Sequence, residues 1–357
     1  MRRLPIAALT LVLAQPPAPS TMTTSYETVT LAPGVTAFVS PPGLGAWVTG
    51  NSLVVVGDSA VLVVDPGHFP PLTRKMIADV KRLTGKPVRW VVDTHWHPDH
   101  WMGNAEYADA YPGVTFVGAP ATRDSILAKG PAFVRGHQDS AAVYKGYEAM
   151  LGKDESPFRA GRPMATGERY ALGFAVADGR AAFPGWQNAR VVAPTLTVAD
   201  SLTLHLGRRD VEVRFLGPAN TAGDVVVWVP DARVLATGDL VVAPIPYAYG
   251  SYIGEWRDVL GRLRAFGAAT LLPGHGPVQR DFAYVDRLAR ALDTLRARAA
   301  GAARDGLSLD SARATLRFAD LERAFEDDDP HLRGLLYVHF LGPGLPWAYG
   351  EARAANR

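Results

Sequence analysis

The octet D-T-H-W-H-P-D-H, residues 93–100, is the feature that most constrains this chain, because it holds three of the nine histidines. It follows "VRWVVD", whose length and β-branched residues predict a buried strand. His95 and His97 are two residues apart, so they share one face of an extended chain and can bind one ion. A proline then forces a bend, after which Asp99 and His100 can face a second ion. A chance run of histidines at a polar turn is the alternative, but the octet favours a metal site.

Two metal ions need more ligands than the octet supplies, so distant residues must complete the site. Asp239 in "ATGDL" and His275 in "PGHG" each follow a short predicted strand. Both lie among glycines, which let the backbone approach closely. Alone, each has an ordinary explanation, a turn aspartate and a surface histidine; beside the octet we interpret both as ligands. The chain has no cysteine, so any metal is held by nitrogen and oxygen atoms.

Composition excludes several classes of protein. The 357 residues are 48% hydrophobic and 20% charged, which is typical of a globular protein with a large core. The net charge of +2 and the lack of a long basic block argue against nucleic acid as a partner. No stretch is apolar for long enough to span a bilayer. We therefore expect a small-molecule substrate and no membrane partner, and leave the oligomeric state open.

The N-terminus predicts export. Two arginines precede the apolar run Leu4–Leu13, and "VLA" then resembles a cleavage site, so residues 1–14 read as a signal peptide rather than a frayed tail. Residues 15–25, rich in proline, serine and threonine, read as a linker. We expect a periplasmic or secreted protein.

The remaining chain divides into a main domain, residues 26–285, and a helical C-terminal extension, residues 286–357. Within the domain, "SLVVVGDSAVLVVD" and "DVVVWVPDARVLATGD" predict hairpins. "LTRKMIADVKRL" and "EWRDVLGRLRAF" have the spacing of amphipathic helices. Residues 120–200 predict an insertion, whose Gly- and aromatic-rich part over about 160–187 we interpret as a lid.

These motifs together resemble the metallo-β-lactamase superfamily. "HWHPDH" resembles its His-x-His-x-Asp-His signature, "TGDL" and "PGHG" its later motifs, and "VVDPG" around Asp65 an early one. The resemblance covers about residues 30–280. It implies a mixed α/β fold, a four-layer αβ/βα sandwich of two sheets between helices with the site at one edge. "TGDLVVAPIPYAYGSY" further resembles an exported hydrolase group that includes quinoprotein-relay-type proteins.

One motif departs from the family pattern, because Asn220 stands in "FLGPANTAGD" where a histidine is expected. The resemblance then implies a first site of His95, His97 and Asn220. The second site comprises Asp99, His100 and His275, and Asp239 bridges the two. An amide oxygen is a poorer zinc ligand than imidazole. We therefore expect one tightly bound Zn²⁺, with the second weak or absent.

The expected reaction is hydrolysis, in which a zinc-bound hydroxide attacks the carbonyl of an ester, lactone, thioester or amide, β-lactams included. Asp99 is expected to orient the water, and Tyr247 to donate a hydrogen bond to the oxyanion, although simple packing of Tyr247 is an alternative. Two other functions stay open: an iron-dependent oxidoreductase of the same fold and a non-catalytic metal-binding or relay protein. The diiron relatives generally have Glu at the position of His97, which argues against the oxidoreductase.

Several neighbours of these motifs are weaker candidates. Asp93, and likewise Thr221 and Asp224, could support a ligand by hydrogen bonding. Trp96 and Trp101 could wall a pocket or pack in the core. The histidines outside the motifs are expected to lie at the surface or to be structural: His68, His137, His205, His331 and His339.

Overall fold

Seven strands form the first sheet in the computed structural model of the chain, which describes residues 25–41, 48–156, 189–325 and 330–355, with short pieces between 161 and 186. Their spatial order follows the chain: Glu27–Ala32 (β1), Val35–Val39 (β2), Ser52–Val56 (β3), Val61–Val64 (β4), Val88–Val92 (β5), Thr115–Gly118 (β6) and Leu196–Thr197 (β7). Strands β1 to β4 are antiparallel, and β4 to β7 are parallel. The predicted first hairpin is confirmed as β3–β4, with Val56 opposite Val61.

The second sheet has five strands, in the order Thr270–His275 (β12), Val234–Val242 (β11), Val225–Val229 (β10), Asp210–Phe215 (β9) and Ser201–His205 (β8). Its strands are antiparallel except for the parallel pair β11–β12. The second predicted hairpin is confirmed as β10–β11, where Val229 pairs with Val234. Asp239 was predicted in a turn but lies inside β11, where the pairing with β12 is irregular on both sides of Gly238.

The two sheets face each other across a core of aliphatic side chains. Leu53 and Leu62 of the first sheet belong to the same buried cluster as Val213, Val227 and Leu272 of the second. In β9 the apolar residues alternate with polar ones, so one side of that strand faces the core and the other faces outward.

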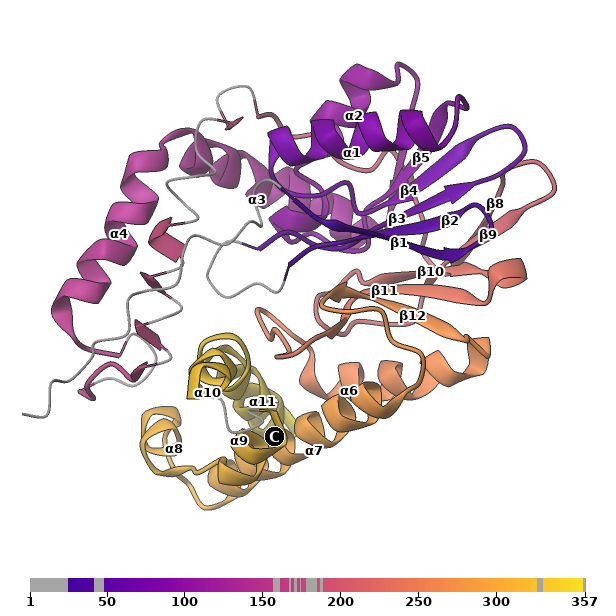
Figure 1. Ribbon diagram of the computed structural model, residues 1–357. Coiled ribbons are helices and arrows are strands. Elements are labelled where there is room, and N and C mark those ends of the chain that lie inside the picture. The colour runs from indigo at the N-terminus through magenta and orange to yellow at the C-terminus, as the bar shows by residue number, and fades with distance from the viewer. Residues whose placement is uncertain are drawn as a thin grey trace, which may run out of the picture.

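Helices cover the outer face of each sheet, which completes the predicted αβ/βα sandwich (Figure 1). Pro70–Leu83 (α1) and Asn104–Ala110 (α2) lie on the first sheet, where Met76 is buried against Val54 and Val63. Ile253–Arg262 (α6) and Ala283–Arg304 (α7) lie on the second sheet, where Trp256 is fully buried. Short 3₁₀ helices occur at Pro98–His100, Pro230–Ala232 and Leu263–Phe266.

The predicted insertion begins with two helices, Pro120–Gln138 (α3) and Ser140–Lys153 (α4). Helix α4 reaches away from the sheets, on the left of Figure 1. The predicted signal peptide, nearly all of the linker and about half of the predicted lid fall outside the described residues.

The C-terminal extension is helical, as predicted. It contains Leu309–Thr315 (α8), Ala319–Phe325 (α9), Pro330–Leu336 (α10), a π-helical turn at Tyr337–Leu341, and Gly342–Ala355 (α11). The predicted boundary after residue 285 falls inside α7, whose Leu292 shares a core with Leu240 of the second sheet and Leu345 of α11. Among the described residues, no helix combines the length and apolarity needed to cross a bilayer.

Candidate metal centre

The candidate site residues follow or terminate strands that meet at one edge of the sandwich. Strands β4 and β5 are parallel, so Asp65 after β4 and the octet after β5 lie at the same sheet edge. His275 ends β12, which runs parallel to β11 and its Asp239. Asn51 joins the two sheets at this edge, because its backbone N–H donates to the carbonyl of Gly274 at 2.7 Å.

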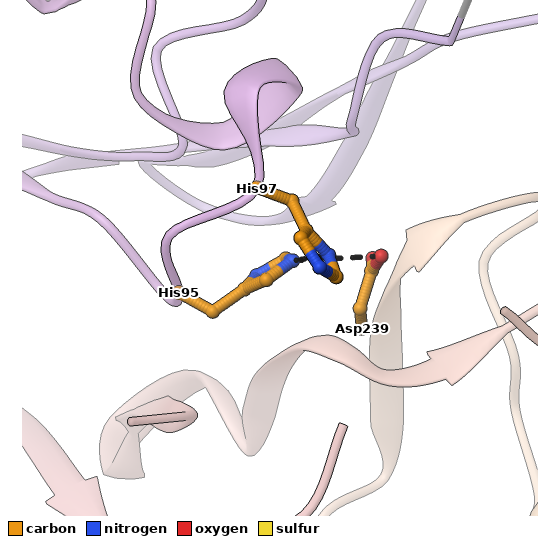
Figure 2. A group of neighbouring side chains, drawn as sticks. All are labelled: His95, His97 and Asp239. Carbon is orange, nitrogen blue, oxygen red and sulfur yellow. Dashed lines mark hydrogen bonds and ion pairs between the residues drawn. The ribbon is translucent and has the colours of Figure 1, made fainter. Parts of the chain in front are cut away.

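The first group of candidate ligands is His95, His97 and Asp239 (Figure 2). His95 Nε2 lies 2.9 Å from His97 Nδ1 and 3.6 Å from Asp239 Oδ2. His95 and Asp239 are fully or almost fully buried. The two octet histidines therefore turn to one point, as their spacing predicts, and a residue about 140 positions away reaches it.

The second group is Asp99, His100 and His275. His100 Nε2 and His275 Nε2 are 3.2 Å apart, and Asp99 Oδ2 lies 3.2 Å and 2.9 Å from them. Asp239 Oδ1 is 3.3 Å from His100 Nε2 and 3.4 Å from His275 Nε2. Asp239 therefore turns Oδ2 toward the first group and Oδ1 toward the second, which is the geometry expected of a bridging carboxylate.

The spacing of these donor atoms suits coordination of a metal ion better than direct contact between the side chains. A tetrahedral zinc site with bonds of about 2.0–2.1 Å has ligand atoms about 3.3 Å apart, and the spacings here run from 2.9 to 3.6 Å. Two neutral imidazole nitrogens that both turn lone pairs inward repel each other unless a cation or a proton lies between them. Asp239 Oδ1 is buried and forms no hydrogen bond with the described residues. The donor set therefore suits one or two divalent cations.

Burial and charge act in opposite directions on these groups. Burial lowers the pKa of His95 and of His97, so both are neutral and able to bind metal. Burial also opposes ionisation of Asp99, but the neighbouring His100 and His275 hold the pKa of that carboxyl well below its usual range. Asp99 is therefore an anion, as a metal ligand must be.

Asn220 is buried in the loop between β9 and β10, and its side chain contacts Tyr247, whose ring lies 5.2 Å from that of His275. Its Nδ2 donates to the carbonyl of Tyr247 at 2.5 Å, which fixes the orientation of the amide. Its Oδ1 is buried and has no hydrogen-bond partner among the described residues. An oriented amide with an unpaired oxygen is compatible with the expected ligand role.

Asp65 supports His100, a role that the quoted "VVDPG" motif did not reveal. His100 Nδ1 lies 2.8 Å from Asp65 Oδ2, and Thr94 donates to the same carboxylate through its backbone N–H and its hydroxyl. This bond leaves His100 Nε2 to face the ion. Asp93 Oδ2 accepts a hydrogen bond from Asn104 Nδ2, and the expected support of a ligand by Asp93 stays a prediction.

Tyr247 and Tyr249, which follow β11, line one side of the centre together with His339 of the C-terminal extension. Tyr247 is buried, with its ring 5.2 Å from that of His275 and 4.6 Å from that of His339. Tyr249 Oη lies 2.5 Å from His339 Nδ1. His339 sits in the π-helical turn, a feature that often marks functional sites. No motif near His339 pointed to this contact.

Other expectations are corrected by burial. His68 was expected at the surface but is buried, with Nδ1 2.7 Å from the carbonyl of Val48 and its ring 5.0 Å from that of Trp186. Trp101 packs in the core and donates to the carbonyl of Trp96, whereas Trp96 is partly buried with its ring 4.8 Å from that of His97.

Thr221 and Asp224 support each other, because the Thr221 N–H donates to Asp224 Oδ2 at 2.6 Å. Burial raises the pKa of Asp224 to about 8. The pair fixes the turn that follows Asn220.

Comparison with known proteins agrees with this geometry. Residues 45–275 match the sequence pattern of the metallo-β-lactamase superfamily. A linear primary-alkylsulfatase from a Pseudomonas species is 26% identical over 241 residues, which cover 62% of this chain and 40% of that protein. The type 2 metallo-β-lactamase of Bacillus cereus is 23% identical over 240 residues, covering 66% of this chain and 70% of that protein. This chain therefore matches less than half the length of the alkylsulfatase.

Solved structures show the same fold. A metallo-β-lactamase from Pontibacter korlensis superimposes with a TM-score of 0.53 at 20% identity, covering 75% of this chain and 99% of that one. The DIM-1 metallo-β-lactamase superimposes with a TM-score of 0.53 at 16% identity, covering 76% and 98%. Since the sequence pattern spans well over half of the residues, the chain belongs to the metallo-β-lactamase superfamily.

Proposed function

We propose that this protein is a metal-dependent hydrolase whose reaction takes place at the His/Asp centre. The observation that carries the proposal is the convergence of six buried or nearly buried donors from three separate segments, with Asp239 turned toward both groups. The two curated relatives support it, since an alkylsulfatase and a β-lactamase both cleave bonds with water.

We assign the first ion to His95, His97 and Asn220, with Asp239 shared. The second ion falls to Asp99, His100 and His275. Zinc, when bound, lowers the pKa of its water to about 7 and so supplies hydroxide at neutral pH. Because an amide oxygen binds zinc less well than imidazole, we propose one tight ion at the second group and a weak one at the first.

Two of the chain's own groups can assist the attack. Asp99 is an ionised carboxylate facing His100 and His275, so it can accept a hydrogen bond from the attacking water and orient it. Burial, followed by the charge of Asp239, raises the pKa of Tyr247 well above its usual range. The phenol therefore keeps its proton at neutral pH and can donate a hydrogen bond to an oxyanion.

The bond cleaved is proposed to be an acyl bond of an ester, lactone, thioester or amide, with β-lactams included. A sulfate ester is the second candidate, favoured by the 26% identity to the alkylsulfatase. The predicted leader leads us to propose that the protein is exported, where it would meet a small-molecule substrate.

The test is to purify the chain without added zinc and to count bound metals by elemental analysis. Turnover of p-nitrophenyl esters, γ-lactones and dodecyl sulfate is then assayed before and after treatment with a chelator. We expect about one tightly held zinc and hydrolysis that the chelator abolishes and zinc restores. Bound iron together with redox activity would favour the oxidoreductase, and metal binding without any turnover would favour a binding or relay protein.

A further inference from the structure

Helix α3 is fixed beside the ligand-bearing octet by contacts with Trp101, which directly follows the octet, and with the loop after Asn220. Near its start, Thr122 Oγ1 donates to the carbonyl of Gly223 at 2.7 Å. In its middle, Gly130 faces Trp101 so closely that an added Cβ would lie 3.1 Å from the indole. Ile126 and Val134 are buried in the same cluster as Trp101. The backbone that carries the intervening residues is therefore rigidly placed beside the octet.

Lys129 projects from this fixed stretch onto Trp96, the residue between His95 and His97. Its Nζ lies 3.6 Å from the centre of the Trp96 ring, a close cation–π contact. The Trp96 ring is in turn 4.8 Å from the ring of His97, so the ammonium lies within roughly 8 Å of a candidate ligand. Phe133, one turn further along α3, also lies near the indole, with the two ring centres 6.0 Å apart.

Among the described residues, the Lys129 ammonium forms no ion pair with a carboxylate. Its contact is the cation–π contact with the face of the Trp96 indole. Lys129 is exposed, and its contact with the Trp96 indole keeps the positive charge beside the octet. A negatively charged group of a molecule bound at the centre would pair with it.

We propose that Lys129 is a specificity-determining residue that selects substrates with an anionic group a few bonds from the scissile bond. The inference rests on the proposed hydrolase function and names the class of its substrate. The stacked indole restricts the lysine before the substrate arrives, so less side-chain entropy is lost on binding than at an unrestrained lysine. A carboxylate, sulfate or phosphate group would each satisfy this charge.

A second stacked lysine provides the matched control. Lys81 lies with its Nζ 5.5 Å from the centre of the Tyr111 ring, on the layer of α1 and α2 that covers the outer face of the first sheet. If a lysine stacked on an aromatic ring serves packing alone, Lys81→Gln and Lys129→Gln should behave alike. If Lys129 recognises the charge of the substrate, only Lys129→Gln should change the selectivity between anionic and neutral substrates.

The experiment uses the zinc-loaded full chain and two esters of similar size, neutral p-nitrophenyl butyrate and the anionic mono-p-nitrophenyl ester of succinic acid. We expect Lys129→Gln to lower kcat/KM for the anionic ester about 5- to 10-fold, as for loss of a charged hydrogen bond, with little change for the neutral ester. Lys129→Glu should lower it further, and added salt should shrink the difference for the wild type. Equal losses for both esters, or the same selectivity change in Lys81→Gln, would overturn the proposal.

An equilibrium arm keeps the inference independent of turnover. Calorimetry compares binding of 4-phenylbutyrate and its neutral amide to the wild type and both variants. We expect the preference for the carboxylate to fall in Lys129→Gln alone. If no ester is cleaved, the proposed hydrolysis of carbonyl compounds fails, and this arm still decides the role of Lys129: an unchanged preference refutes it.

Discussion

His100 Nδ1 and Asp65 Oδ2 lie 2.8 Å apart, and both side chains are buried at the edge where β4 and β5 end. Asp65 adopts a left-handed backbone conformation, with φ of 53°, to bring its carboxylate under the octet. The same carboxylate accepts two hydrogen bonds from Thr94, so it cannot turn away. This contact fixes which nitrogen of His100 faces the candidate ions.

Replacing Asp65 by Asn should therefore weaken metal binding without removing a ligand. An amide can face His100 with its N–H₂ group, which no longer stabilises the Nδ1–H form. We expect zinc affinity, measured by competition with a fluorescent chelator, to fall about 10- to 100-fold. Asp79→Asn is the control, because Asp79 is a buried carboxylate of α1 paired with Lys75; an equal loss of zinc there would contradict the role given to Asp65.

Replacing Asn220 by His should restore the ligand that the family pattern places there. Imidazole binds zinc better than an amide oxygen does, so we expect a second tightly held equivalent by elemental analysis. Asn220→Ala separates the two functions of the side chain, because it removes the oxygen and also leaves the Tyr247 carbonyl without its donor. That variant should lose about 1–3 kcal/mol of unfolding free energy and gain no metal. Unchanged metal content in Asn220→His would place Asn220 outside the coordination sphere.

The sequence predicted most of the centre because its signals are local. Closely spaced histidines at the end of one strand can face the same ion without long-range contacts. The side chains of the octet do come together in this way. Asp239 and His275 were predicted through strand ends beside glycines, although Asp239 proved to lie within β11. All six His and Asp residues of the two candidate groups were named from the sequence, whereas the expected ligand role of Asn220 stays a prediction.

Contacts that depend on tertiary packing left no such signal. Asp65 reaches His100 across two parallel strands, and its partner could not be read from its own neighbours in sequence. His339 is remote from every motif and reaches Tyr249 through the fold of the C-terminal helices. Lys129 was one residue of a helical stretch, and only the placement of α3 sets it over Trp96.

Gly274 should tolerate no side chain, because it packs directly on Asp239. A Cβ at this position would lie 2.0 Å from Asp239 Oδ1 and 2.7 Å from the backbone of Gly238. We expect Gly274→Ala to displace the carboxylate and abolish tight zinc binding. Gly350→Ala in α11 is the matched control, since its Cβ would meet nothing within 4 Å; it should raise stability by about 0.5–1 kcal/mol. Normal zinc binding by Gly274→Ala would show that Asp239 is not constrained as described.

His339 should link the C-terminal extension to the tyrosine loop. His339→Ala removes one partner of Tyr249 Oη, while the hydrogen bond from Tyr249 Oη to the Val338 carbonyl and the backbone bond from Ala248 N–H to the residue 339 carbonyl can persist. We expect a loss of about 1 kcal/mol in unfolding free energy and a larger change in KM than in metal content. His339→Asn, which keeps a hydrogen-bonding group, should restore part of the KM. His205→Ala is the control, because His205 is exposed and pairs with Asp210 far along the second sheet; the same KM change there would exclude a specific role.

Asp224 should give the metal-free protein a pH-dependent stability of definite sign. Burial raises its pKa to about 8 in the folded state from 3.8, so between these values the folded chain keeps a proton that the unfolded chain has lost. Stability must then fall as pH rises through this window, by up to about 1.4 kcal/mol per pH unit. Asp224→Asn keeps an acceptor for the Thr221 N–H but does not titrate. Urea unfolding in excess chelator, from about pH 5 to about pH 8, should therefore show the variant gaining stability relative to the wild type as pH rises; parallel curves would mean that Asp224 is already ionised in the folded chain.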